Sequence, residues 1–575
     1  MHFILAGMTH LSRFRTHPSI LFALTVAGVL CGCTQKDLTA PDGAAGAAAA
    51  ATTHALRNKV DTIVVIYAEN RAFDNLYGNF PGARGLSEVI DRHGKPLPSY
   101  QPQRDRNGTV LPVLPPTWGG VTAAGVAPVV TQQQSAGLPN APYSIEHGFT
   151  AQSQVTLSTD TVTRDLWHRF YEHQMQIDGG KNDGYAAWSD AGGLAMGYYD
   201  YSRSSLYALA KEFVLADNFF QGAFGGSFLN HQYLICACAP EYPNADAAAA
   251  QPSIALLEQD SAGRFLPRLK TATNPPDSAL DEPPTFALSG NIAPANYFGD
   301  GKFYAVNTMQ PPYQPSGNKP AAGDASFADA DPNNATTLPP QTRRNIGDAL
   351  DDKRIDWAWY AGSWNAAVAD GSRPPSKMRE VIYAPPTAGG NPDFQTHHQP
   401  FNYFERFDPA THAEHRAAHL KDYKDLLADI SAGRLPAVAF YKPQGNLNQH
   451  AGYASVAEGD AHIAELVAKL RASPQWNRMV IVITYDEFGG AWDHVAPPQG
   501  DLLGPGARIP ALIISPFAKR GTVDHTQYDT ESILRLITRR FDLEVLPGIT
   551  QRDSGLAAHG APPMGDLTHA LDLVH

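Results

Sequence analysis

Ser227 follows two glycines and precedes an apolar, helix-like run in FGGSFLNHQYL, residues 224–234. A glycine turn into a helix N-terminus leaves a side chain open to approach and places positive potential beside it. A nucleophilic hydroxyl needs both. The same pattern is typical of a helix N-cap, in which a serine only accepts hydrogen bonds from the first backbone N–H groups. The rest of the chain must distinguish the two interpretations.

Two apolar segments end in adjacent carboxylate or amide side chains. The pairs are Glu69–Asn70 after DTIVVIYA and Asp486–Glu487 after RMVIVITY. Either pair alone is explained by a turn or a helix cap. Ligands in open α/β sheets bind beyond the carboxyl ends of the strands, so both pairs together predict a metal pocket with oxygen ligands. Gly-Gly and then His494 follow the second pair, which adds a nearby imidazole.

Several histidines lie in distinctive loop settings. They are His147 in PYSIEHGF, His397 and His398 in QTHHQPF, and His450 in NLNQHAGY. A lone loop histidine is usually a solvated surface residue. By contrast, His412, His415 and His419 in THAEHRAAH have helical spacing and are interpreted as a solvated helix face.

The fold class predicted from the apolar pattern is α/β. Four apolar segments are typical of strands covered on both faces: 61–70, 436–443, 478–487 and 509–516. Helical periodicity in 459–474 and 528–541 completes a sandwich with a largely parallel central sheet flanked by helices. Residues 240–345 are rich in Pro, Ala, Asn and Asp and lack a sustained period, which predicts a loop-rich insertion.

The N-terminal residues are predicted to direct export. Basic residues precede SILFALTVAGVL, which is shorter than the roughly 20 residues of a membrane span, so residues 1–33 are expected to be a signal peptide. Cys33 follows a small residue, as in a bacterial lipoprotein signal, and would then carry lipid and attach the protein to a membrane. Ordinary signal cleavage is the alternative. The expected location is the periplasm, the outer membrane as a lipoprotein, or the medium.

The remaining boundaries follow from composition. Residues 34–57, rich in Ala, Gly and Thr, are expected to be a flexible linker. The catalytic domain is expected over 58–555 and a C-terminal tail over 556–575.

A net charge of -13 argues against nucleic acid as a partner. Cys236 and Cys238 are expected to be buried thiols, because helical residues two apart point to different sides.

Four motifs occur in order between about residue 60 and about residue 545. They are ENRAFDNLYG, GGSFLNHQYL, HHQPF and YDEFGGAWDHV. Together they resemble a bacterial phosphoesterase family of phospholipases C and acid phosphatases, within the wider alkaline-phosphatase-like superfamily. The phospholipase branch typically shows a threonine in a GPT-x-PNR setting, so GGSFLNH is more similar to the acid-phosphatase branch.

The resemblance implies a site built around one divalent metal ion. Its ligands would be Glu69, Asn70, Ser227, Asp486 and Glu487. Acid phosphatases of the family tend to carry two aspartates at the last pair, so Glu487 departs from the pattern. Ser227 would also be the nucleophile. The residues implied to surround the phosphoryl oxygens and the leaving group are His147, His397, His398 and His450. Oxygen ligation suits Mg, Ca or Mn, and nearby histidine also admits Fe or Zn.

The expected function is that of an exported, metal-dependent acid phosphatase that hydrolyses phosphate monoesters through a phosphoserine intermediate. The alternative is a phospholipase C-type phosphodiesterase that acts on phospholipid headgroups. A third interpretation is a non-catalytic surface lipoprotein on a degenerate phosphatase fold. Loss of Ser227 or of the strand-end carboxylates would favour that interpretation, and all of them are present.

Overall fold

A computed structural model describes residues 43–307, 312–313, 315–324, 326, 329–384 and 393–574. The chain divides into two units, Met1–Ala50 and Ala51–His575. The first unit is described only over residues 43–50, which are helical. The predicted signal peptide and Cys33 lie outside the described residues. Within the described part of the chain, no helix is both long and apolar enough to cross a bilayer.

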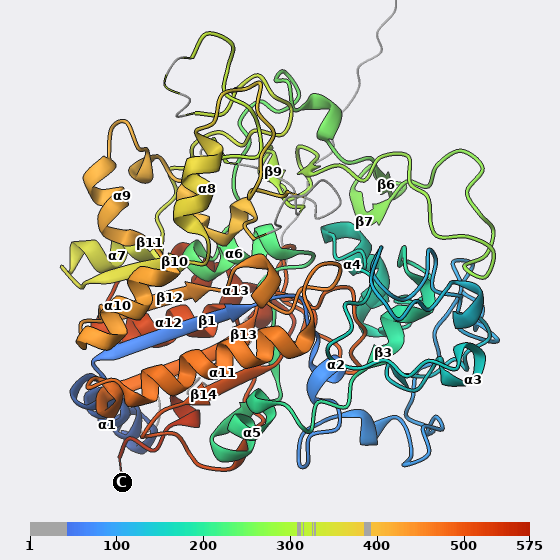
Figure 1. The fold of residues 1–575 in the computed structure, drawn as a ribbon, viewed down its shortest axis with the longest axis horizontal. Coiled ribbons are helices and arrows are strands. Elements are labelled where there is room, and N and C mark those ends of the chain that lie inside the picture. The colour runs from blue at the N-terminus through green and yellow to red at the C-terminus, as the bar shows by residue number, and fades with distance from the viewer. Residues whose placement is uncertain are drawn as a thin grey trace, which may run out of the picture. The chain divides into compact units, whose positions relative to one another are not determined.

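The second unit is built around an eight-stranded sheet with the order β11-β10-β12-β1-β13-β14-β4-β15 (Figure 1). Among the described residues, β14 is antiparallel to both neighbours and the other paired strands are parallel. The predicted largely parallel sheet is therefore confirmed. Its strands are β1 (Thr62–Ala68), β4 (Val214–Ala216), β10 (Trp357–Ala361), β11 (Leu420–Asp422), β12 (Val438–Lys442), β13 (Met479–Tyr485), β14 (Ala511–Ile514) and β15 (Thr522–Asp524).

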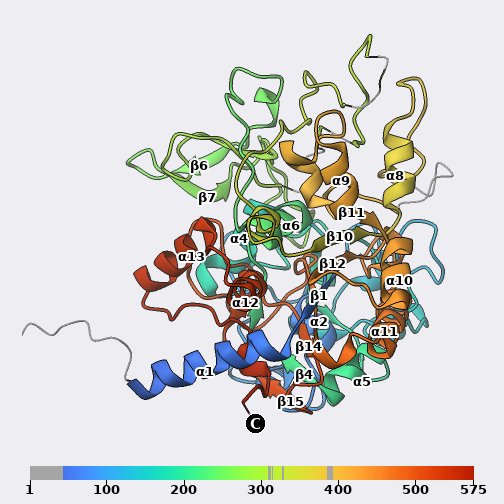
Figure 2. The same cartoon turned by 90° about the vertical axis from the view of Figure 1, so that its left-hand side faces the viewer.

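Helices cover both faces of this sheet, as Figures 1 and 2 show together. One face carries α5 (Ser205–Glu212), α10 (Tyr423–Ala432) and α11 (Val456–Ala472). The other carries α6 (Ser227–Cys236), α12 (Glu531–Phe541) and α13 (Pro547–Ala558). Every residue of β1 and β13 is buried between the two layers, which explains their uninterrupted apolar sequences. The α/β prediction is confirmed.

Shorter elements complete the unit. The helices are α2 (Phe73–Tyr77), α3 (Thr150–Ser153), α4 (Phe170–Ile177), α7 (Ile346–Asp352), α8 (Trp364–Gly371) and α9 (Ala413–His419). The strands outside the main sheet are β2 (Tyr143–Ser144), β3 (Gly197–Tyr198), β5 (Phe219–Phe220), β6 (Leu257–Gln259), β7 (Phe265–Leu269), β8 (Ile292–Ala293), β9 (Tyr304–Ala305) and β16 (Tyr528–Asp529).

The segment 240–345 joins α6 to α7 and contains the small pairs β6–β7 and β8–β9. It packs against α4, at the upper right of Figure 1. Asn307 Oδ1 accepts a 2.7 Å hydrogen bond from the backbone N–H of Phe170, and Ser289 donates a 2.6 Å hydrogen bond to Glu172. The segment therefore holds the first turn of α4 in place.

The described parts of the predicted linker and tail are structured. The expected flexible linker is helical from residue 43 onward, because its alanine run has the highest helix propensity, and α1 continues over Gly43–Lys59. At the other end, residue 556 lies inside α13 rather than at a boundary. Leu571 and Leu573 beyond it are buried in the core of the unit, so these residues belong to the folded body.

Cys236 and Cys238 form a disulfide, with their Cα atoms 5.1 Å apart. The expectation of two free thiols is therefore wrong. The reason is local: Cys236 is the last residue of α6, and Ala237 adopts a left-handed conformation with φ 50° and ψ 41°. The chain thus leaves the helix between the two cysteines, and their side chains can meet.

Arg552 of α13 anchors the loop that leads to Ser227. Its guanidinium is fully buried and donates to Asp501 (3.0 Å), Asp529 (2.9 Å) and the carbonyl oxygen of Gly222 (2.6 Å). Because Asp529 is also fully buried, its charge is balanced inside the protein rather than by water.

We expect Arg552→Met to lower the free energy of unfolding by about 3–5 kcal/mol, because it leaves a buried carboxylate without its partner. The matched control is Arg264→Met, which removes a 2.8 Å ion pair to Asp260 from a side chain that is 81% exposed. The control should change stability by less than about 1 kcal/mol. Denaturant unfolding of both variants tests this, and equal losses would contradict a structural role for Arg552.

Candidate active site

The two predicted pairs of polar residues meet at one edge of the sheet. Strands β1 and β13 are parallel neighbours, with Ala68 opposite Tyr485. The residues that follow them, Glu69 and Asp486, are therefore side by side at the carboxyl edge. Both are fully buried.

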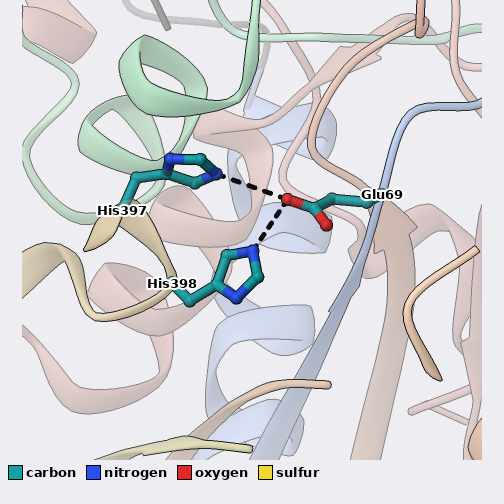
Figure 3. Close-up of side chains that lie close together, drawn as sticks. All are labelled: Glu69, His397 and His398. Carbon is teal, nitrogen blue, oxygen red and sulfur yellow. Dashed lines mark hydrogen bonds and ion pairs between the residues drawn. The ribbon is translucent and has the colours of Figure 1, made fainter. Parts of the chain in front are cut away.

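Glu69 is surrounded by positively charged and hydrogen-bonding groups. Its Oε1 lies 3.4 Å from His397 Nε2 and 3.0 Å from His398 Nε2, as Figure 3 shows. Lys442 Nζ lies 3.4 Å from the same oxygen, and Asn448 donates to Oε2. Burial opposes ionisation of Glu69, but Lys442 and the histidines outweigh it and hold the carboxyl pKa well below its usual range.

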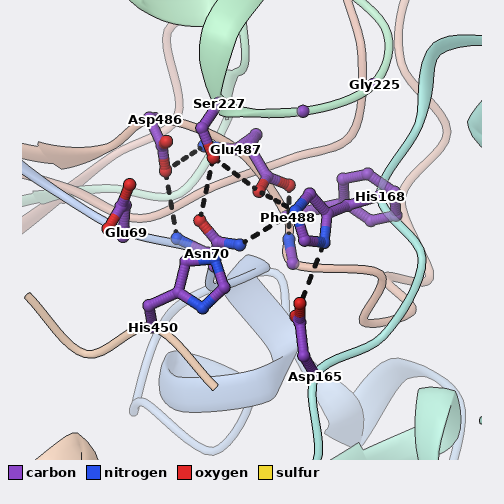
Figure 4. A network of polar contacts seen from close by, with 12 residues as sticks. Glu69, Asn70, Asp165, His168, Gly225, Ser227, His450, Asp486, Glu487 and Phe488 are labelled. Atoms are coloured by element: carbon purple, nitrogen blue, oxygen red, sulfur yellow. Dashed lines mark hydrogen bonds and ion pairs between the residues drawn. The ribbon is translucent and has the colours of Figure 1, made fainter. Parts of the chain in front are cut away.

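Asn70 is held in an unusual conformation beside the second pair. Its φ is 62°, and its backbone N–H donates to Asp486 Oδ1 at 3.0 Å (Figure 4). The turn after Glu487 approaches closely, because a Cβ on Gly489 would lie 2.3 Å from the Asn70 carbonyl oxygen. The glycine is thus needed for the two strand ends to come together. Non-glycine residues at positive φ cluster at functional sites.

Ser227 projects into this network from the first turn of α6. Gly226 occupies the N-cap position, and the Ser227 hydroxyl donates instead to Asn70 Oδ1 (3.3 Å) and Glu487 Oε1 (3.5 Å), as Figure 4 shows. The capping interpretation is therefore not supported. Gly225 has φ 84°, and a Cβ there would lie 2.6 Å from the backbone nitrogen of Phe170. The glycine turn thus allows the serine to reach the strand-end oxygens.

The buried carboxylates Asp486 and Glu487 are not fully balanced by positively charged neighbours. Burial raises the pKa of Asp486 to about 6, and burial together with Asp486 raises that of Glu487 well above its usual range. Asp486 Oδ2 is buried and has no hydrogen-bond partner among the described residues. A divalent cation fits this donor set of carboxylate, amide and hydroxyl oxygens. The residues that could hold it are those predicted: Glu69, Asn70, Ser227, Asp486 and Glu487.

A cavity of about 250 Å³ lies next to Ser227. Its polar lining includes His397 and His450, as predicted. The Nδ1–H of His450 donates to the Ala451 carbonyl, so Nε2 is the nitrogen left for a ligand. Burial lowers the pKa of both imidazoles, and for His397 this outweighs the opposing effect of Glu69.

His168 also lines the cavity, and sequence reasoning missed it. Its Nδ1–H donates to the Leu166 carbonyl at 2.6 Å, and Nε2 lies 3.4 Å from Asn70 Nδ2. The Asn70 amide nitrogen thus faces His168 while the amide oxygen faces Ser227. Burial lowers the pKa of His168 to about 4, so the ring is neutral and can accept from the amide. The available signal was Asp165-Leu-Trp-His168, a carboxylate and an imidazole three residues apart.

Three other predicted histidines do not reach the cavity. His147 is exposed in a turn and is not among the residues that line the cavity. His494 lies 2.6 Å from an oxygen of Asp74 and is not among the residues around Ser227. His398 contacts Glu69 but is fully buried and does not line the cavity, so it orients a carboxylate rather than facing a substrate.

Lys442 is a second residue that sequence reasoning missed. It is the last residue of β12, and its side chain is completely buried. Its ammonium lies 5.6 Å from the centre of the Tyr67 ring as well as close to Glu69. The signal was a lysine at the end of a buried strand, PAVAFYKP. The lysine is thus paired with a strand-end carboxylate inside the protein.

Two solved structures that match parts of this chain share little of its sequence. An alkaline phosphatase superfamily protein from Vibrio parahaemolyticus is 14% identical, with a TM-score of 0.19 over 37% of this chain and 50% of that one. A phosphonate monoester hydrolase from Silicibacter pomeroyi is 16% identical, with a TM-score of 0.20 over 59% of this chain and 68% of that one.

Sequence comparison gives a clearer relationship. Non-specific phospholipase C5 from Arabidopsis thaliana is 37% identical over 123 residues, which are 17% of this chain and 23% of that protein. Phospholipase C B from Mycobacterium tuberculosis is 31% identical over 151 residues, 22% of this chain and 29% of the relative. The chain thus spans less than a third of the length of these relatives. Residues 60–544, most of the chain, match the phosphoesterase family, and the chain belongs to that family.

Proposed function

We propose that this protein is an exported, metal-dependent acid phosphatase that hydrolyses phosphate monoesters through a phosphoserine intermediate. The observation that carries the proposal is the position of Ser227. Its hydroxyl lies within 3.5 Å of Asn70 Oδ1 and Glu487 Oε1 and borders a polar cavity. A serine that is aimed at strand-end oxygens rather than at the backbone of its own helix is suited to nucleophilic attack.

The first half of the reaction forms the phosphoserine. Ser227 Oγ bonds to phosphorus while the bond from phosphorus to the ester oxygen breaks. The serine proton passes to Glu487 Oε1, which lies 3.5 Å from the serine oxygen and accepts its hydrogen bond. His450 Nε2 gives its proton to the departing oxygen, which leaves as an alcohol. A bound divalent cation lowers the pKa of a neighbouring hydroxyl and neutralises phosphoryl oxygens.

The second half restores the enzyme. A water molecule attacks phosphorus and gives one proton to His450 Nε2, and the bond to Ser227 Oγ breaks. The proton held on Glu487 returns to the serine oxygen, and inorganic phosphate leaves. Lys442 and His398 keep Glu69 ionised throughout, because both contact its Oε1. His168 keeps the Asn70 amide turned so that its oxygen faces the nucleophile.

A phosphodiesterase that acts on phospholipid headgroups is the second candidate, because the relatives above are named phospholipases C. The polar lining of the cavity supports a small, polar substrate, because Asp165, Arg169 and Gln395 border it beside the histidines.

We expect Ser227→Ala to lower kcat on a phosphate monoester at least about 1,000-fold, because the variant has no nucleophile to form the phosphoserine. The wild-type protein should hydrolyse the monoester faster than phosphatidylcholine. Acid quenching during turnover of a ³²P-labelled monoester should trap label on Ser227 in the wild type and none in the variant. A variant that keeps a tenth of the activity would contradict the nucleophile, and faster cleavage of phosphatidylcholine would favour the diesterase.

The pH dependence should reflect His450. Burial lowers its pKa below the ordinary imidazole value near 6.5, although Asp165 and Glu69 act in the opposite direction. The protonated, proton-donating form is therefore lost as pH rises through this lowered pKa. We expect kcat for an alkyl phosphate to fall with rising pH from a maximum on the acid side of neutrality.

A nitrophenyl phosphate needs no proton on its leaving group, so its alkaline decline should be weaker than that of the alkyl phosphate. His450→Ala should remove the difference between the two substrates. His147→Ala, on the exposed surface, is the matched control and should keep both wild-type profiles. If kcat of the wild type declines equally for both substrates as pH rises, a histidine is excluded as the general acid.

Export and lipid attachment are supported by the N-terminal sequence alone. We propose that Cys33 becomes the first residue of the mature protein and carries lipid, which would anchor it to a membrane. Cys33→Ser should then move the protein from the membrane fraction to the soluble exported fraction. Cell fractionation tests this, with Cys31→Ser as the matched control that stays with the membrane. A wild-type protein that is already soluble would favour ordinary cleavage.

A further inference from the structure

Three side chains far from Ser227 in the sequence converge around one point. Asp351 belongs to α7, and His415 and His419 belong to α9. Their potential ligand atoms all lie within 4.8 Å of one another. His415 Nε2 is 3.6 Å from Asp351 Oδ2, and His419 Nε2 is 3.8 Å from Asp351 Oδ1. The histidines were expected on a solvated face, but their side chains are only 24% and 14% exposed.

Neighbouring groups orient two of these side chains. The Nδ1–H of His419 donates to the Trp357 carbonyl at 2.7 Å, and the imidazole stacks on the Trp357 ring with 4.2 Å between ring centres. The Trp357 indole N–H donates in turn to Asp351 Oδ1 at 2.9 Å. Backbone and indole partners of this kind fix the orientation of metal-binding histidines and carboxylates, and here they leave Nε2 as the free nitrogen of His419.

His415 supplies an independent observation. Its Nε2 is buried and has no hydrogen-bond partner among the described residues. The ring packs against Phe407, with 4.8 Å between ring centres, and lies edge-on to His419 at 4.7 Å. A buried polar atom without a partner requires an explanation, and an unplaced ion is one.

Arg406 is the cation that already faces this cluster. Its Nη2 lies 3.3 Å from Asp351 Oδ2, and its other terminal nitrogen pairs with Asp348. The Arg406 side chain is 47% exposed. It can therefore withdraw from Asp351 and keep its contact with Asp348 when another cation binds.

The cluster lies at the opposite edge of the sheet from the active site. Trp357 is the first residue of β10, and it pairs with Val438 at the start of β12. Lys442, at the end of β12, contacts Glu69 in the active site. The strand from Val438 to Lys442 is about 13 Å long, at roughly 3.3 Å per residue, so the two groups lie beyond opposite ends of β12.

We propose that Asp351, His415 and His419 form a second metal site, which binds a zinc-class divalent ion and joins α7 to α9. Two imidazoles and one carboxylate are a donor set for Zn²⁺, with a fourth position left for water. Ligands at about 2.0–2.2 Å from a tetrahedral ion lie about 3.4 Å from one another. The three ligand atoms lie within 4.8 Å of one another, so binding an ion would draw them together by up to about 1.4 Å.

The experiment counts zinc ions on the full-length protein. Chelator-treated protein is dialysed against Zn²⁺, and bound zinc per chain is measured by mass spectrometry. Asp486→Asn is the background, because it disables the catalytic site and leaves this one intact. Adding His415→Gln should lower the zinc content by one ion per chain, and adding His412→Ala, the matched control, should not.

Two further readouts separate binding from misfolding. Zn²⁺ should raise the Tm of Asp486→Asn, and His415→Gln should abolish that rise without changing the Tm of the metal-free protein. On the wild-type background, His415→Gln should keep its phosphatase activity. Zinc content that is unchanged by both His415→Gln and His419→Gln would overturn the proposal, as would a Tm that does not respond to Zn²⁺ in Asp486→Asn.

Discussion

The central constraint on this protein is the burial of several carboxylates at the ends of adjacent strands. Because β1 and β13 are parallel and in register, Glu69 and Asp486 must lie side by side away from water. Like charges in such a position repel one another and resist ionisation. Lys442 offsets part of this charge. The carboxylate, amide and hydroxyl oxygens at the strand ends are donors that a divalent cation fits, and such an ion would offset the rest.

The sheet and the loops make different contributions to the site. The strands fix the oxygen ligands, whose positions follow from the register of a buried core. The imidazoles lie on three separate connections between strands. These connections bring His168, His397 and His450 to the same cavity. Connections tolerate more sequence change than buried strands, so residues that line the cavity can change while the strand ends stay in place.

The sequence was sufficient to predict those parts of the structure in which burial imposes a pattern of apolar and polar residues. The apolar runs predicted the strands, and polar residues at their ends predicted the oxygen cluster. It was not sufficient where long connections place the side chains. His147 and His168 both lie in the connection between β1 and β4, and only the structure shows that His168 is the one near Ser227. Local context also failed for Cys236, since a single left-handed residue after it allows the disulfide. Helical spacing alone did not show that most of the His415 and His419 side chains is covered by other residues.

The contact between Gly225 and Phe170 gives the insertion an influence on the nucleophile. The insertion residue Asn307 holds the Phe170 backbone, and the Phe170 backbone limits the space at Gly225, two residues before Ser227. The segment 240–345 is thus connected to the turn before the reactive hydroxyl through two successive contacts, Asn307 with Phe170 and Phe170 with Gly225. A substitution that displaces Asn307 is therefore expected to alter the turn before Ser227, even though about 80 residues separate the two along the chain.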